Sequence, residues 1–296
     1  MWLLFALLCP LLFAIVCVVD SYCVERVFER PWMGAITSSL ASAMVFLIAP
    51  LAVAGWHPPG WKITALALLA GVLTQLSQAL YFQALSYSEA GIVAAYINLV
   101  PVILPVVSYL LFNQAFGWWT YAGIAVNIVA AVWMCLADTN LEARWRSFFL
   151  MLVVCLFYSA GVLLEKQVFD HIPVLEGFLL ITTGIVLSGA LPLVAPDIRR
   201  IFISNLAVLK PAITMLLGIE VVNLLAIYTR HQALSRGDPS LTEAIATTQP
   251  AYTFLLSFGL CLIAPQLGDP QAKRKLWLKL LLTGAMAIGV RLVSSG

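Results

Sequence analysis

Charge is what this sequence has little of. Only 10% of its 296 residues are Asp, Glu, Lys or Arg, whereas 62% are hydrophobic and the mean hydropathy is +0.99. A soluble domain carries about 25% charged residues. The composition therefore excludes a soluble globular protein and predicts an integral membrane protein. The net charge of +2 is spread along the chain, which excludes a basic surface for nucleic acid.

Motifs for catalysis or metal binding are also missing. The sequence has no G-x-S-x-G, no H-E-x-x-H and only three histidines, of which His57 and His171 fall in predicted loops. Its six cysteines lie mostly in apolar runs with no C-x-x-C, as is typical of small packing residues. We therefore expect neither an enzyme nor a bound cofactor or metal.

Long apolar runs are what the sequence does have. About 20 residues are needed to cross the hydrocarbon of a bilayer as a helix, and runs of this length are too long for barrel strands. The first run lacks a basic start and an A-x-A-like cleavage site, so we expect a retained span rather than a signal peptide. The fold class predicted is an all-α membrane protein with ten transmembrane helices, near residues 2–22, 34–55, 63–86, 89–112, 117–137, 147–168, 175–195, 211–235, 239–263 and 276–293.

A phrase of the sequence occurs twice. A shift of 149 residues places Gln83-Ala84-Leu85-Ser86 on Gln232-Ala233-Leu234-Ser235 and Pro101 on Pro250, and a shift of 145 places Asp20 on Glu165. The chain therefore divides into two five-span halves, residues 1–140 and 141–296. Because five is odd, the second half must enter the membrane from the opposite side, which makes the halves inverted repeats, as in many secondary transporters.

These residues carry a family resemblance. The QALS-like end of the third span, the small-residue turn and the proline of the fourth span, all repeated in the second half, are similar to the EamA-like branch of the drug/metabolite transporter superfamily. The resemblance implies a central cavity lined mainly by the third, fourth, eighth and ninth spans, and transport of small metabolites, often as export. A Gly-Glu pair common in the family is absent at Phe112-Asn113-Gln114 and at Pro265-Gln266, so no glutamate is carried over from that motif.

Polar side chains inside the spans are the candidate substrate-binding residues. A charge near the bilayer centre costs about 2.5–3.5 kcal/mol, so each one calls for a partner or a function. The alternatives are polar contacts between helices, an Arg230 that extends to the interface, a packed His231 and a helix-end Glu243. The candidates are Glu220, Asn223, Arg230 and His231 in the eighth span, Thr74, Gln78 and Tyr81 in the third, Glu243 and Thr247 in the ninth, and Asn98 in the fourth.

Two further pairs occupy equivalent positions in the halves. Pro101 and Pro250 each remove a backbone hydrogen bond about 12 residues inside a span, and are candidate hinges. Asp20 and Glu165 end the first and sixth spans, and are candidate gate residues near opposite membrane faces. The alternative for this second pair is two interfacial acids, with Lys166 offsetting the charge of Glu165.

The function predicted is a secondary transporter in the cell (inner) membrane, working by alternating access. Its expected partners are the lipid bilayer, a small polar substrate such as an amino acid, and protons that couple through Glu220; a monomer or a homodimer is expected. The alternatives are a flippase for a lipid-linked sugar or phosphate, which would use Arg230 for the phosphate, an intramembrane enzyme, and a purely structural protein. The membrane side that holds the termini has only five Lys and Arg residues, which are Lys62, Lys166, Arg230, Arg236 and Arg291. The positive-inside rule therefore favours termini outside the cytoplasm. Relatives usually have both termini inside.

Overall fold

The computed structural model describes residues 2–48, 50, 59–104, 117–137, 141–236, 242, 245–263 and 276–295. Regular structure in these residues is helical, with no strand among them. The elements are α1 (Trp2–Arg26), α2 (Trp32–Ser42), η1 (Ala43–Ile48), α4 (Trp61–Leu85), α5 (Ala90–Ile97), α7 (Trp118–Ala137), α8 (Leu141–Phe169), α9 (Val174–Ala190), η2 (Leu191–Val194), α10 (Pro196–Leu209), η3 (Lys210–Ala212), α11 (Ile213–Arg236), α13 (Gln249–Ile263) and α14 (Leu276–Ser295).

The helices confirm the all-α class. Each of the ten apolar runs contains a helix, and the described residues include five helical stretches that are long and apolar enough to cross a membrane. Apolar helices that are shorter occupy Trp32–Ile48, Ala90–Leu104 and Gln249–Ile263. The five long stretches are Leu3–Arg26, Trp61–Leu85, Trp145–Phe169, Val174–Val194 and Pro196–Arg236.

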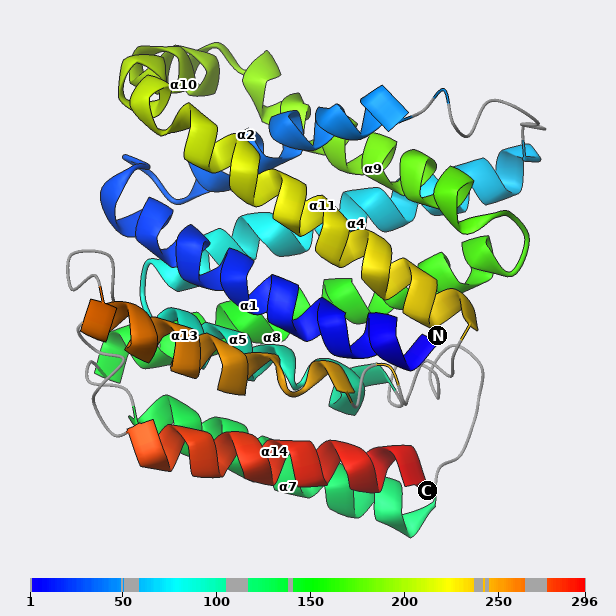
Figure 1. Ribbon diagram of the computed structural model, residues 1–296, viewed down its shortest axis with the longest axis vertical. Helices are drawn as coiled ribbons and strands as arrows, with labels where there is room; N and C mark the ends of the chain where they lie inside the picture. The colour runs from blue at the N-terminus through cyan, green and yellow to red at the C-terminus, as the bar shows by residue number, and fades with distance from the viewer. Residues whose placement is uncertain are drawn as a thin grey trace.

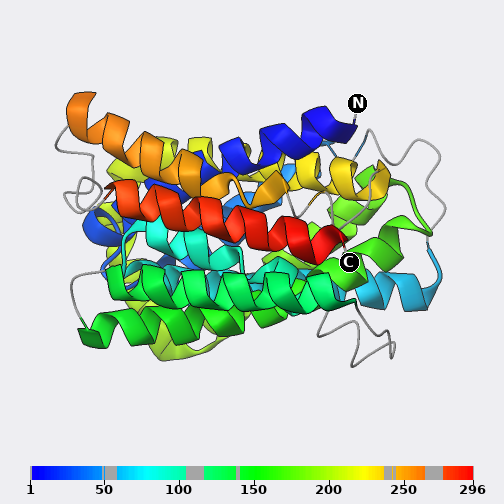
Figure 2. The ribbon, with the colours of Figure 1, turned by 90° about the horizontal axis from the view of Figure 1, so that it is seen from below.

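Most of the helices lie side by side in one bundle, and the two ends of the chain lie at the same end of it (Figures 1 and 2). In the bundle α4 packs against α8 and α9, α1 packs against α11, α5 against α13, and α7 against α14. The main hydrophobic core takes large buried side chains from both halves of the chain, including Phe82, Tyr96, Met151 and Phe254. Distant parts of the sequence thus share one core.

Two glycines allow α4 and α9 to approach closely. A Cβ added to Gly71 would lie 2.8 Å from the Cα of Gly184, and a Cβ added to Gly184 would lie 3.1 Å from the Cα of Gly71. Small residues of this kind let helix backbones approach in a membrane, where packing rather than the hydrophobic effect joins helices. The contact fixes α4, which carries much of the site described below.

One helix was absent from the sequence-based prediction. Residues 196–209 lie between the predicted spans 175–195 and 211–235 and were assigned to neither. The structure forms α10 there, with Pro196 in its first turn, where proline is favoured, and with Phe202 and Leu209 buried in the main core. Its charged residues Arg199 and Arg200 remain exposed.

The two equivalent prolines have a stronger effect than a kink. Helix α5 ends at Ile97, and a turn at Asn98-Leu99 precedes a further helical stretch to Leu104. In the second half a turn at Thr247-Thr248 precedes α13. Each turn lies just before Pro101 or Pro250, whose ring removes a hydrogen bond and crowds the carbonyl four residues earlier. The fourth and ninth spans are therefore interrupted helices rather than continuous ones.

Candidate functional site

A cavity with a mixed lining opens between α1, α4, α8 and α11. Its volume is about 150 Å³, and its walls are mostly apolar with a limited set of polar groups, a pattern typical of small-molecule sites. Helices α5 and α13 contribute little, so the first and sixth spans line it more than the fourth and ninth spans named by the family resemblance. The predicted residues that line it are Asp20, Thr74, Gln78, Tyr81, Glu165, Asn223 and Arg230.

Glu220 is held at this cavity by three hydrogen-bond donors. Its side chain is buried, with an exposed fraction of 3%. The hydroxyls of Ser38 and Ser42 on α2 donate to its two carboxylate oxygens over 2.6 Å each, and Asn223 Nδ2 donates to Oε1 over 3.0 Å. Gln78 Nε2 donates in turn to the Ser38 hydroxyl over 2.8 Å. The network joins three predicted residues to two serines and connects α2, α4 and α11.

Arg230 forms a second polar cluster. Its NH1 group donates to Glu165 Oε2 over 2.8 Å, and its guanidinium carbon lies 4.7 Å from the centroid of the Tyr158 ring. Both charged side chains are buried, so Arg230 does not extend to the interface. Lys166, beside Glu165 in sequence, pairs with Asp170 instead over 2.7 Å and leaves Glu165 to Arg230.

His231 lies next to this ion pair but faces an aromatic wall. Its side chain is fully buried. Its ring centroid lies 4.7 Å from that of Phe169 and 5.7 Å from that of Phe178. Its Nε2 lies 3.7 Å from Glu165 Oε1, which is beyond a hydrogen bond. The interpretation of His231 as a packed histidine therefore fits the structure better than its interpretation as a residue facing the cavity.

Asp20 and Glu165, the candidate gate residues, do not pair with each other. Tyr81 donates its hydroxyl to Asp20 Oδ2 over 3.3 Å, and Asp20 lies close enough to Glu220 to interact with it electrostatically. Two carboxylates and one guanidinium thus border the cavity, with Arg230 beside Glu165, while Glu220 lies behind the lining residues Ser42 and Asn223. Neither acid is an exposed interfacial residue, because Asp20 and Glu165 are both buried.

Asn98, Thr247, Pro101 and Pro250 are not among the residues that line this cavity. Asn98 Nδ2 donates to the backbone carbonyl of Thr247 over 3.3 Å, so the two equivalent turns touch each other where α5 meets α13. Pro101 and Pro250 are buried just beyond these turns. Thr74 lines the cavity but returns its hydroxyl to the carbonyl of Ala70 over 2.9 Å. Glu243 lies outside the described residues.

Sequence reasoning missed several polar residues. Ser38 and Ser42 are four residues apart in the second span, a spacing that places both on one helix face and was the available signal. Lys279 was counted only as a positive charge near a loop. It forms a buried ion pair with Glu89, which lies at the start of α5, and its ammonium lies 5.8 Å from the centroid of the Phe254 ring. A lysine inside an apolar run was the signal there.

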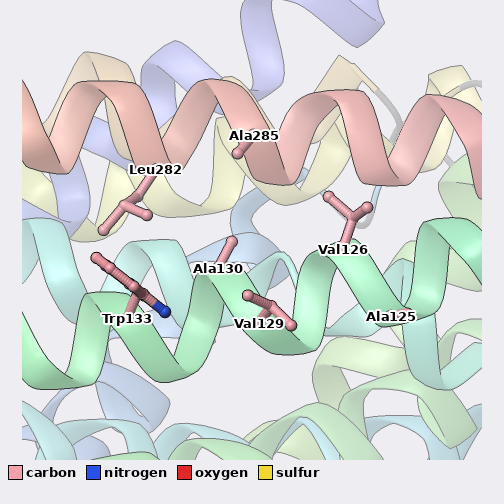
Figure 3. Close-up of a pocket in the computed structure, with 7 residues that line it drawn as sticks. All are labelled: Ala125, Val126, Val129, Ala130, Trp133, Leu282 and Ala285. Atoms are coloured by element: carbon pink, nitrogen blue, oxygen red, sulfur yellow. The ribbon is translucent and has the colours of Figure 1, made fainter.

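A second depression has no such chemistry. It is an open groove between α7 and α14, lined by Ala125, Val126, Val129, Ala130, Trp133, Leu282 and Ala285 (Figure 3). Its lining offers almost no polar surface to orient a solute. Within the described ranges no three His, Cys, Asp or Glu side chains are placed to hold a metal ion, and the side chains of Cys9, Cys17, Cys23, Cys155 and Cys261 are buried.

Comparison with known proteins agrees with the sequence resemblance. Residues 1–136 match the family model described as "EamA-like transporter family". A solved structure described as "Crystal structure of protein" aligns with 99% of this chain and 96% of its own, at a TM-score of 0.60 and 13% sequence identity, and it is one of 28 matching chains of known structure. That likeness is one of fold. No curated protein sequence matches this chain. The match over residues 1–136 and the apolar helices support an integral multi-pass membrane protein.

Proposed function

We propose, from the membership of residues 1–136 in the EamA-like transporter family, that this protein is a secondary transporter for a small polar metabolite such as an amino acid. It works in the cell membrane by alternating access, and the family resemblance favours export. The observation that carries the proposal is the cavity lined by Asp20, Glu165 and Arg230 between apolar walls, with Glu220 hydrogen-bonded to the lining residues Ser42 and Asn223.

The packing of the helices supports two inverted repeats, residues 1–140 and 141–296. If the halves are equivalent, α1, α2, α4 and α5 correspond to α8, α9, α11 and α13. Corresponding helices make corresponding contacts. Helix α4 packs on α8 as α11 packs on α1, and α1 packs on α13 as α8 packs on α5. Two pseudo-symmetric halves can exchange conformations, which produces inward-open and outward-open states of similar energy.

The charges around the cavity suit a zwitterion. A solute carboxylate would take the donors of Arg230, a residue whose planar guanidinium recognises carboxylates in a bidentate way. A solute ammonium would take the region of Asp20, an acid of α1 that lines the same cavity. In the structure Arg230 forms an ion pair with Glu165. Binding a substrate carboxylate therefore requires Arg230 to exchange one carboxylate partner for another.

Proton coupling is assigned to Glu220. As a carboxylate it accepts the hydroxyl hydrogens of Ser38 and Ser42, which link α11 to α2. A protonated Glu220 donates a hydrogen through one oxygen, so the serine at that oxygen must accept instead of donate and turn its own hydroxyl hydrogen elsewhere, which changes the link between the helices. Protonation thereby changes how the second half is held against the first.

The test is transport by the purified protein in liposomes with an imposed pH gradient. We expect Glu220→Gln to remove the dependence of the rate on the gradient, because glutamine keeps the size of the side chain but cannot bind and release a proton. Asp170→Asn, which alters an exposed acid paired with Lys166, is the matched control and should leave the rate unchanged. Coupling through Glu220 is wrong if the glutamine variant keeps both its full rate and its pH dependence.

Substrate class is tested by a thermal-shift screen of the purified protein against amino acids, nucleosides, sugars and lipid phosphates. A binder stabilises the folded state by an amount that grows with the logarithm of its concentration relative to Kd. We expect amino acids with both charged groups to raise Tm, and their esters or N-acetyl forms to raise it much less. Stabilisation by lipid phosphates alone would favour a flippase instead.

A further inference from the structure

Helix α10 differs from the helices of the bundle in direction. In Figure 1 the helices α1, α4, α11 and α14 run across the view, whereas α10 is seen nearly end-on, at the end of the bundle away from both chain termini. A helix that lies across a membrane-spanning bundle at its end lies in the plane of the bilayer surface. This direction suits contact with lipid headgroups rather than a passage through the hydrocarbon.

The faces of α10 are divided by chemistry. One row of residues, Ile198, Phe202, Asn205 and Leu209, packs inward at helical spacing, and the last three of these are buried. The next row, Arg199, Ile203, Leu206 and Lys210, is exposed along its whole length. Two apolar side chains therefore lie between two cations on the outer face, with Arg200 beside the first of them. This is the pattern of an interfacial amphipathic helix.

The cations of α10 are available to a ligand. Throughout the part of the chain that the structure describes, Arg199, Arg200 and Lys210 form no ion pair, and all three side chains are exposed. The helix that presents them is held firmly. Asn205 Nδ2 donates to Glu29 Oε2 over 2.5 Å, which ties α10 to the segment after α1, while Phe202 and Leu209 enter the main core.

We propose that the outer face of α10 is a binding site for anionic phospholipids. Arg199, Arg200 and Lys210 contact the phosphate-bearing headgroups, while Ile203 and Leu206 enter the upper acyl region between them. Basic residues close to an anionic membrane surface attract it, and long basic side chains can reach headgroups while their stems lie against apolar surface. Because η3 joins α10 directly to α11, the bound lipid also steadies the start of the helix that carries Glu220 and Arg230.

The experiment is a lipid titration of the full-length protein in neutral detergent, followed by native mass spectrometry. Phosphatidylglycerol, phosphatidylcholine and inorganic phosphate are compared. We expect selective retention of phosphatidylglycerol, and apparent affinity for it on the order of 100-fold weaker in the triple variant R199Q/R200Q/K210Q, since each cation contributes about a factor of five. High salt should weaken binding to the unmodified protein in the same direction.

A matched variant separates a defined site from general attraction. K62Q/R236Q/R291Q removes the same number of exposed positive charges, from α4, α11 and α14, and should keep the affinity for phosphatidylglycerol. Circular dichroism and Tm confirm that both variants fold. Unchanged lipid affinity in the α10 variant overturns the proposal, as does an equal loss in the control variant. Full displacement by inorganic phosphate also overturns it, because the site would then serve a free anion.

Discussion

Arg230 is a buried cation paired with a carboxylate. Its partner Glu165 is 2.8 Å away, and the Tyr158 ring lies 4.7 Å from the guanidinium carbon. If the Glu165 carboxylate is removed, Arg230 loses this partner while it stays buried. Breaking a buried ion pair by removing one partner costs about 3–5 kcal/mol, whereas replacing both partners together costs far less.

We therefore predict that Glu165→Gln lowers the free energy of unfolding by about 3 kcal/mol, measured by chemical unfolding in detergent. The double variant E165Q/R230Q should recover most of this loss but should not transport, because the carboxylate-binding group is gone. The neighbouring Lys166→Gln breaks only an exposed pair and should change stability by less than about 1 kcal/mol. An equally unstable double variant would mean that lost packing, and not an unpaired charge, explains the effect.

At the scale of elements, the contact between α4 and α9 depends on two glycines. Any Cβ at Gly184 would press against the backbone of α4, because Gly71 Cα lies 3.1 Å from that position and the Leu68 carbonyl lies closer still. Backbone atoms cannot move aside as a flexible side chain can. The helices must therefore separate to accept even one methyl group.

Gly184→Ala is predicted to destabilise the protein by about 1–3 kcal/mol, the usual cost of overpacking. Gly218→Ala is the matched control, since a Cβ at Gly218 in α11 meets nothing within 4 Å and alanine is the better helix former. Thermal unfolding of both purified variants checks this, with Tm lower for the first and equal or higher for the second. A similar Tm for both variants would contradict the close approach of α4 and α9.

The elements also differ in how far the sequence could predict them. Long apolar runs identified ten helical regions, since hydrophobic length is a local property. Helix α10 was missed because its pattern is amphipathic and its short length is compatible with a loop. The turns before Pro101 and Pro250 were anticipated only as kinks. A proline's missing hydrogen bond is visible in a sequence, but whether the helix bends or breaks depends on contacts such as that between Asn98 and Thr247.

The candidate site was predictable to a similar extent. Glu220 and Asn223, three residues apart on one helix, were expected to share a face, and they hydrogen-bond to each other. The partner of Arg230 was not predictable, because Glu165 lies 65 residues away and a sequence does not state how α8 meets α11. Ser38 and Ser42 carry no charge and so did not stand out, although they complete the Glu220 network.

For the whole molecule, the distribution of positive charge predicts an orientation. Both termini lie at one end of the bundle, and α10 lies at the other (Figure 1). Arg230 and Lys279 are buried in ion pairs, so they do not count among the loop charges that decide orientation. This takes one cation from each side of the membrane. The excess at the α10 end remains within the described part of the chain, through Arg26, Arg30, Arg144, Arg146, Arg199, Arg200 and Lys210. The positive-inside rule therefore places the α10 end in the cytoplasm.

We predict that epitope tags on the N-terminus and the C-terminus both bind antibody in intact cells. A third tag inserted between Gly268 and Asp269 should bind only after permeabilisation, and serves as the internal control. Tags on both termini that require permeabilisation would reverse the orientation, and would mean that charge in the loops does not decide insertion here. Two halves of five spans each cross the membrane ten times and return the chain to the side on which it began. Termini on opposite sides would therefore contradict the even number of crossings and the division into two five-span halves.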